Sequence, residues 1–289
     1  MVSKENLLTT NQMASFVARG FLRFDEFVPD EINQAVMAEI DAGIPSAAAG
    51  VPLSQCYPEP SAIGHMLRMP KVEGIIQSLV GPDPLFDHQA VHVRQPNEDS
   101  AQGMHGDSII DTRTQNFDVQ LMYFPHDVPL EMGGTLVVPG SQYRRINEMD
   151  IARYQNLLGQ VQMVCKAGTL LALHHGIWHC GRQNKTNLKR YMFKVRLNPR
   201  VSQIKLWNTD DLTNAVKANK PIFTRDTNKV EDVQTILGRP EPWFEDAAGR
   251  LEVVNRIKMW RYLTDDPTFD VHYWLTRLEN TPANRELVA

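Results

Sequence analysis

The sequence lacks most features that mark membrane, secreted or nucleic-acid-binding proteins. No run approaches the ~18 consecutive apolar residues that a membrane-spanning helix needs. Residues Met1–Thr10 contain no apolar stretch of the kind found in secretory signals. The three cysteines, Cys56, Cys165 and Cys180, have no paired spacing, which favours reduced thiols. A formal net charge of −4 gives no broad basic surface. We therefore expect a cytoplasmic protein without nucleic-acid or membrane partners.

Repeats, low-complexity runs, charge blocks and linker-like segments are also missing. Apolar residues make up 42% of the chain and charged residues 22%, which are ordinary values for a globular protein with a full core. Because all-β barrels of this length are often single domains, we predict one domain over residues 1–289. We divide it into a helical N-terminal part (1–84), a β-rich core (85–200) and a helical C-terminal decoration (201–289).

Helical patterns dominate the N-terminal part. The first helix is expected to begin at Thr10, as its cap, and to end at Gly20. Alternation of apolar and polar residues predicts a short strand directly after it, over Phe21–Phe24. Further along we expect a helix from Pro29, a long loop over Gly43–Pro60 and a helix over Pro70–Leu79.

Strand patterns replace helical ones after residue 84. The clearest is Phe117–Phe124, in which Val119, Leu121 and Tyr123 share one face. Short strands separated by Gly and Pro turns predict a sandwich or a barrel. The other expected strands are Phe86–Arg94, Thr135–Val138, Val161–Cys165, Thr169–Leu173 and Arg190–Leu197, with a helical turn over Tyr154–Gln160. The expected C-terminal helices are Asp211–Ala218, Val230–Leu237, Leu251–Arg261 and Phe269–Leu278.

Two segments of the expected β core carry a possible metal-ligand set. The sequence contains a single His-x-Asp, His105 and Asp107, flanked by Gly residues. Residues two apart on a strand point the same way, so both side chains can meet one ion. His179 stands eleven residues before Arg190, a spacing that predicts two rungs on neighbouring antiparallel strands. Two histidines and one carboxylate are the ligand set of non-haem Fe(II) oxygenases, which leaves three coordination positions open.

The choice of His179 rests on its neighbours. His174 and His175 are adjacent and point to opposite faces of an extended segment, so at most one could face inward, and we interpret both as packed or surface imidazoles. His179 is followed by Gly181 and then by Arg190, and an unpartnered buried imidazole would be costly. Cys180 is interpreted as a packed thiol. Zinc is the rival metal, but a structural zinc site needs four ligands and the chain contains no CxxC.

Arg190 begins an otherwise apolar strand. Burying a guanidinium without a partner is expensive, whereas its planar fork of donors suits a carboxylate. The alternative is an ordinary surface arginine beside Lys189.

With these residues in place, the chain resembles the phytanoyl-CoA dioxygenase family of Fe(II)/2-oxoglutarate oxygenases over residues 7–197. The resemblance implies a mainly β fold with flanking helices, built on a double-stranded β-helix (a cupin-like jelly roll). The motifs that carry it are LLTT…GFLRFDEFVP (7–29), HGD (105–107), EMGGTLVVPGS (131–141) and Trp178-His179…Asn184…Arg190.

The resemblance also implies roles for individual residues. His105, Asp107 and His179 correspond to the iron ligands, and Arg190 to the anchor for the distal carboxylate of 2-oxoglutarate. Thr135 and Gln102 correspond to positions that assist this cosubstrate in some members. The chain departs from the family pattern at Gln95, Met132 and Gln142, where the family often has Lys, Asn and His. The presence of Asp107 favours hydroxylation over halogenation, because related halogenases have a small residue there.

The sequence therefore predicts a dioxygenase that uses Fe(II), 2-oxoglutarate and O2 to oxidise a C–H bond of a small organic substrate, with release of succinate and CO2. We expect substrate contacts from Gly43–Pro60, Ser108–Asn116 and the C-terminal helices. Two alternatives stay open, a jelly-roll metal enzyme that does not use 2-oxoglutarate and a catalytically silent binding protein. For the C-terminal third, we expect core packing as the default role. A lid or a homodimer contact is the alternative.

Overall fold

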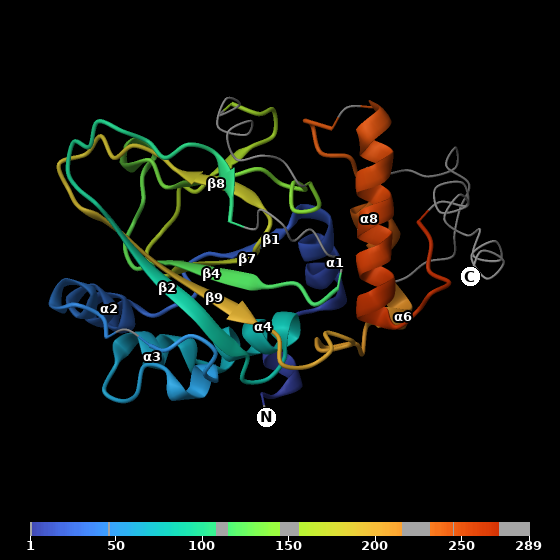
Figure 1. The fold of residues 1–289 in the computed structure, drawn as a ribbon, viewed down its shortest axis with the longest axis horizontal. Coiled ribbons are helices and arrows are strands. Elements are labelled where there is room, and N and C mark those ends of the chain that lie inside the picture. The colour runs from blue at the N-terminus through green and yellow to red at the C-terminus, as the bar shows by residue number, and fades with distance from the viewer. Residues whose placement is uncertain are drawn as a thin grey trace.

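Two antiparallel sheets form the centre of the computed structural model, which describes residues 2–45, 47–107, 115–144, 156–215, 232–244 and 246–271 (Figure 1). The five-stranded sheet has the order β1-β7-β4-β9-β2, and the four-stranded sheet has the order β3-β8-β5-β6. This arrangement confirms the predicted jelly roll. The strands are β1 (Phe21–Phe24), β2 (Leu85–Arg94), β3 (His105–Gly106), β4 (Val119–Phe124), β5 (Thr135–Val137), β6 (Val161–Gln162), β7 (Thr169–His174), β8 (Trp178–Gly181) and β9 (Arg190–Asn198).

The side chains of β4 point alternately to the two faces of the five-stranded sheet, and each face is covered by a hydrophobic core. Val119, Leu121 and Tyr123 point outward into the large core that the helices complete. Met122 points inward, into a smaller core enclosed by the two sheets. All six residues of β4 are buried, as expected for a strand with neighbours on each face. The predicted grouping of the three outward residues is confirmed.

Helices pack on the outer face of the five-stranded sheet. Figure 1 shows α2, α3 and α4 along one side of this sheet, and α1 beside the long α8. No helix in the part of the chain described here combines the length and apolarity needed to cross a bilayer. The helices are α1 (Thr10–Arg19), α2 (Asp30–Ala42), α3 (Ala62–Leu67), α4 (Pro70–Val80), α6 (Leu212–Ala215), α7 (Val233–Gly238) and α8 (Asp246–Thr264), with single 3-10 turns at Lys4–Asn6, Leu53–Gln55 and Leu130–Met132.

The ends of α1 show how local sequence places a helix on this sheet. Thr9, rather than the expected Thr10, caps its start through a reciprocal capping box with Gln12. The hydroxyl of Thr10 instead donates to Asp211 at 2.5 Å. Gly20 ends the helix in the left-handed conformation (φ 78°), as predicted, and β1 begins at the next residue.

Several other expectations differ from the structure at the edges of elements. Helix α3 was not predicted, because its six residues are too few to show a helical period. The expected strand over Val161–Cys165 continues only to Gln162. The described part of Tyr154–Gln160 forms a turn without a helix, and Phe269–Val271 is not helical. The remainder of Phe269–Leu278, residues 216–218 of Asp211–Ala218 and most of Ser108–Asn116 lie outside the described residues.

The predicted pairing of the strands that carry His179 and Arg190 is wrong. β8 lies in the four-stranded sheet and β9 in the five-stranded sheet, so the chain crosses between sheets after Gly181. His179 pairs with His105 across β3, whereas Arg190 pairs with Arg94 across β2. A spacing of eleven residues is compatible with a hairpin within one sheet and with a connection that crosses from one sheet to the other. The crossing brings both side chains to one inner cavity from opposite walls.

Candidate metal centre

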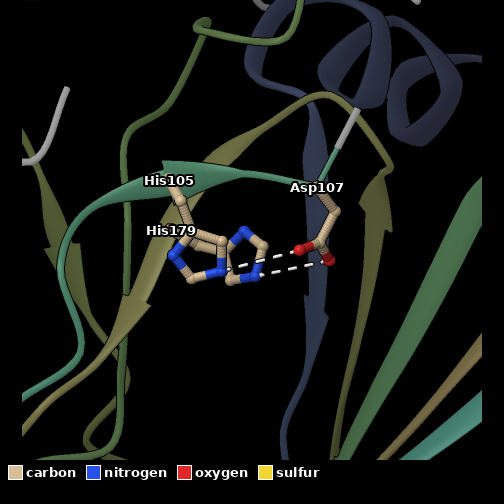
Figure 2. Close-up of side chains that lie close together, drawn as sticks. All are labelled: His105, Asp107 and His179. Carbon is tan, nitrogen blue, oxygen red and sulfur yellow. Dashed lines mark ion pairs between the residues drawn. The ribbon is translucent and has the colours of Figure 1, made fainter. Parts of the chain in front are cut away.

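His105, Asp107 and His179 lie together where β3 and β8 pair. The two histidines are directly opposite in the strand register, with ring centroids 4.6 Å apart. Asp107 follows β3 and turns its carboxylate toward both rings (Figure 2). Its Oδ1 lies 3.5 Å from Nε2 of His105, and its Oδ2 lies 3.7 Å from Nε2 of His179. One ligand atom from each side chain fits within 4.8 Å of the others, and no second cluster of this kind exists among the described residues.

Backbone carbonyls hold both imidazole rings in a ligating orientation. Nδ1 of His105 lies 2.8 Å from the carbonyl oxygen of Gly103, and Nδ1 of His179 lies 3.1 Å from that of Ile177. A carbonyl only accepts hydrogen bonds, so each Nδ1 carries the proton. The Nε2 atoms, which carry the lone pair when the rings are neutral, face Asp107. Anchoring of the distal nitrogen in this way fixes the tautomer of metal-ligating histidines.

The charge states of His179 and Asp107 also suit a divalent metal. Burial lowers the pKa of His179 to about 4, so its imidazole is neutral and free to donate a lone pair near pH 7. Burial opposes ionisation of Asp107, but two cations outweigh it and hold the carboxyl pKa well below its usual range: His179, which is protonated in the acid where this carboxyl titrates, and Lys194. Two neutral nitrogens and one carboxylate oxygen fit Fe(II) with open positions and do not form the closed four-ligand site of structural zinc.

The buried histidines predict a loss of stability in mild acid. Burial lowers the pKa of His175, like that of His179, from 6.5 to about 4. As the pH falls, the unfolded chain takes up these protons first, so the metal-free protein loses stability between about pH 6.5 and pH 4. At pH 5 we expect a loss of roughly 2 kcal/mol per histidine. Urea unfolding at pH 7 and pH 5 measures it.

Two variants isolate the contribution of His179 to the pH dependence of the unfolding free energy. H179Q removes one of the depressed groups, so its unfolding free energy is expected to depend less on pH than that of the wild type. H65Q changes an exposed histidine on α3 and is expected to keep the wild-type dependence. Equal pH dependence in H179Q and wild type would contradict the assignment of a buried neutral imidazole.

Arg190 is a buried cation at the deep end of the inner cavity. Its side chain is only 4% exposed, and its Nη1 donates to the carbonyl oxygens of Met132 at 2.6 Å and Arg182 at 3.0 Å. Within the described residues, no carboxylate forms an ion pair with it. Burial and the neighbouring Arg94 lower its pKa to about 10, which leaves it charged near neutral pH. Among the described residues, this buried positive charge therefore contacts backbone carbonyls but no carboxylate, and Glu98 acts on it only through its charge.

Thr135 and Gln102 also line this cavity; the cosubstrate roles that the resemblance implies for them stay predictions. The amide oxygen of Gln102 accepts from the backbone N–H of Gly181 at 3.0 Å, and its Nε2 lies 3.3 Å from Nε2 of His105. A Cβ added to Gly181 would lie 3.3 Å from Arg94, 3.4 Å from Gln102 and 3.7 Å from Arg190. The glycine thus leaves space where an amide and two guanidinium groups converge.

Sequence reasoning missed three polar residues that line the cavity, His92, Arg94 and Lys194. The side chain of Arg94 is 19% exposed and pairs with Glu98 at 3.1 Å. Lys194 donates to Oδ2 of Asp107 at 2.9 Å. The signal that could have found Lys194 is its even spacing from Arg190, which places both on one face of β9.

His174, His175 and Cys180 behave as expected. His174 and His175 are both buried and lie outside the metal cluster. The ring of His174 stacks on Phe117 with centroids 5.3 Å apart, so it belongs to the packed core. Cys180 is fully buried among apolar side chains.

Wider hollows lie elsewhere on the described surface. One of about 370 Å³ lies beside α3 and α4, and one of about 700 Å³ lies between α2 and residues 55–62. The second includes part of Gly43–Pro60, the segment from which we expected substrate contacts. Neither includes a residue of the metal cluster, so the inner cavity is the candidate site.

Comparison with solved structures supports this fold. The carbocyclase SnoK from nogalamycin biosynthesis, a non-haem α-ketoglutarate-dependent enzyme, is 15% identical with a TM-score of 0.53, covering 77% of this chain and 96% of its own. HygX from Streptomyces hygroscopicus with iron bound is 15% identical with a TM-score of 0.52, covering 67% and 88%. EctD from S. alaskensis with 2-oxoglutarate and 5-hydroxyectoine is 16% identical with a TM-score of 0.52, covering 66% and 76%. Because the sequences are only 15–16% identical, the similarity establishes the fold alone.

Comparison with families tests the resemblance directly. A search of curated proteins finds no match. The family model for phytanoyl-CoA dioxygenase (PhyH) matches residues 16–192, which is more than half of the chain and includes β3, Asp107 and β8. The resemblance seen in the motifs is confirmed, and the chain belongs to the phytanoyl-CoA dioxygenase family.

Proposed function

We propose that the protein is an Fe(II)- and 2-oxoglutarate-dependent dioxygenase that hydroxylates a C–H bond of a small organic substrate. The observation that carries this proposal is the convergence of His105, Asp107 and His179 beside the buried guanidinium of Arg190, which contacts no carboxylate among the described residues. Membership of the family supports the reaction class. The structural relatives with iron or 2-oxoglutarate bound support the choice of metal and cosubstrate.

In this proposal, His105, Asp107 and His179 hold the ferrous ion. When bound, the ion supplies the redox chemistry by which 2-oxoglutarate and O2 become succinate and CO2 while a substrate C–H becomes C–OH. The histidines can present their Nε2 atoms to the ion because the carbonyls of Gly103 and Ile177 hold the Nδ1 side of each ring. The protein therefore delivers a ligand set that needs little rearrangement.

The deep end of the cavity holds the cosubstrate. Arg190 receives the distal carboxylate of 2-oxoglutarate through its free donors, and the nearby Arg94 adds a second positive charge. Thr135 and Gln102 line the path between this end and the metal ligands. Two methionines, Met122 and Met192, complete the wall with apolar surface. Their side chains exclude water from the space between the two charged ends.

Two finer assignments belong to the same proposal. We place the protein in the cytoplasm, where the three buried cysteines, free in the structure, remain reduced. A homodimer contact through the C-terminal third remains a prediction.

Succinate formation tests the proposal. Purified protein loaded with Fe(II) is expected to convert 2-oxoglutarate to succinate under air, slowly alone and faster with an accepted substrate. Candidate small molecules can therefore be screened by succinate yield. Stoichiometric iron without any succinate across the screen would contradict the proposed reaction.

The same assay separates the two alternatives. A jelly-roll metal enzyme that does not use 2-oxoglutarate would turn over its substrate without succinate and would tolerate loss of Arg190. A catalytically silent binding protein would fail to hold stoichiometric iron at the three ligands.

A further inference from the structure

Lys194 forms a buried ion pair with a residue of the metal cluster. It lies on the inner face of β9, between Arg190 and Arg196, and its side chain is 10% exposed. Its Nζ donates to Oδ2 of Asp107 at 2.9 Å. Lysine is rarely buried unless it is paired, so this contact accounts for its position.

Lys194 makes the two oxygens of Asp107 inequivalent. The imidazoles alone do not distinguish the two oxygens, because Oδ1 lies 3.5 Å from His105 and Oδ2 lies 3.7 Å from His179. Such a carboxylate could chelate one ion with both oxygens. The ammonium group contacts Oδ2, and within the described residues no donor reaches Oδ1. A lone pair engaged by an ammonium is less available to a metal.

We propose that Lys194 is a positioning residue. Its hydrogen bond to Oδ2 of Asp107 keeps this oxygen from binding the metal, so that the carboxylate binds through Oδ1 alone. The consequence for turnover rests on the proposed function. A metal ion held by three protein donors would keep positions open for 2-oxoglutarate and O2. A chelating Asp107 would occupy one of them. Lys194 thereby keeps the site able to accept both reagents.

This role differs from that of a metal ligand. The ammonium repels a divalent cation, so its removal does not weaken the electrostatic attraction of the site for metal. We therefore expect K194M to bind Fe(II) within about tenfold of the wild type while its succinate formation falls by about 10- to 100-fold, the range typical of outer-sphere changes. Loss of a ligand would instead lower both together.

Carboxylate vibrations of the protein loaded with Co(II) alone test the proposal directly. Difference infrared spectra with 13C-labelled aspartate distinguish a monodentate carboxylate, with widely split stretches, from a chelating one with a smaller splitting. The wild type is expected to show the wide splitting and K194M the small one, with a matching change in the visible Co(II) bands. K194R retains a cationic donor and is expected to restore the wild-type spectrum.

The matched control is R196M. It removes another cation from the same face of β9, one paired with Asp118 at 2.5 Å rather than with the metal cluster. Its spectrum is expected to match the wild type. A chelating carboxylate in the wild type would overturn the proposal even if the variants fail to fold. A wide splitting in K194M, or a small splitting in R196M or K194R, would also overturn the proposal.

This experiment needs neither 2-oxoglutarate nor O2. It therefore separates failure of the Lys194 proposal from failure of the proposed function.

Discussion

Replacing His179 with Ala is expected to abolish stoichiometric iron binding and, with it, succinate formation. His179 is 4% exposed and lies opposite His105, so no other histidine in the described residues can take its place at the cluster. Loss of an outer-sphere partner typically costs 10- to 100-fold in metal affinity, and loss of a ligand should exceed that. Anaerobic titration with Fe(II), followed by metal analysis after gel filtration, measures the effect.

Folding must be separated from ligation in this experiment. Circular dichroism and thermal melting of metal-free H179A establish whether the fold survives. H65A removes an exposed histidine from α3 and is expected to bind iron like the wild type. A folded H179A that retains wild-type iron affinity would show that the metal centre is assigned to the wrong residues.

Replacing Arg190 with Ala is expected to raise the dissociation constant for 2-oxoglutarate strongly while leaving iron affinity nearly unchanged. Truncating one partner of a buried, hydrogen-bonded charge pair costs about 2–5 kcal/mol, which corresponds to roughly 30- to several thousand-fold in affinity. Iron binding is spared because Arg190 contacts backbone carbonyls and none of the three ligands. Titration of 2-oxoglutarate into the anaerobic Fe(II) protein separates the two constants.

Two variants control this prediction. R190K keeps the charge but loses the planar fork, so its 2-oxoglutarate affinity is expected to fall between those of R190A and the wild type. R200A removes a half-exposed arginine near the end of β9 and is expected to change neither constant. If R190A bound 2-oxoglutarate normally, the jelly-roll enzyme that does not use this cosubstrate would become the better assignment.

The residues that were predictable from sequence carry local signals. His105 and Asp107 are two apart, and a strand sends both side chains the same way. Gly20 ends α1 because the left-handed conformation there suits glycine. Each of these signals depends only on neighbours in the chain. His179 was singled out by its neighbours Gly181 and Arg190, and the family motifs then joined it to His105 and Asp107, which lie more than seventy positions away.

The features that sequence reasoning missed depend on distant partners. The strand after Arg190 was interpreted as apolar, although Lys194 and Arg196 share its face. On an isolated strand such a polar face normally points to solvent. Here it points into the barrel, because helices cover the other face of the sheet and a second sheet closes over this one. The crossing between β8 and β9 is also a tertiary event that the spacing alone does not determine.

Anaerobic addition of 2-oxoglutarate to the Fe(II)-loaded protein tests the central claim most directly, namely that one ferrous ion and one diacid meet in the inner cavity. The expected result is a visible metal-to-ligand charge-transfer band that saturates at stoichiometric iron and is absent from H179A. A wild-type protein that binds iron without developing the band, or an equal band in H179A, would contradict it.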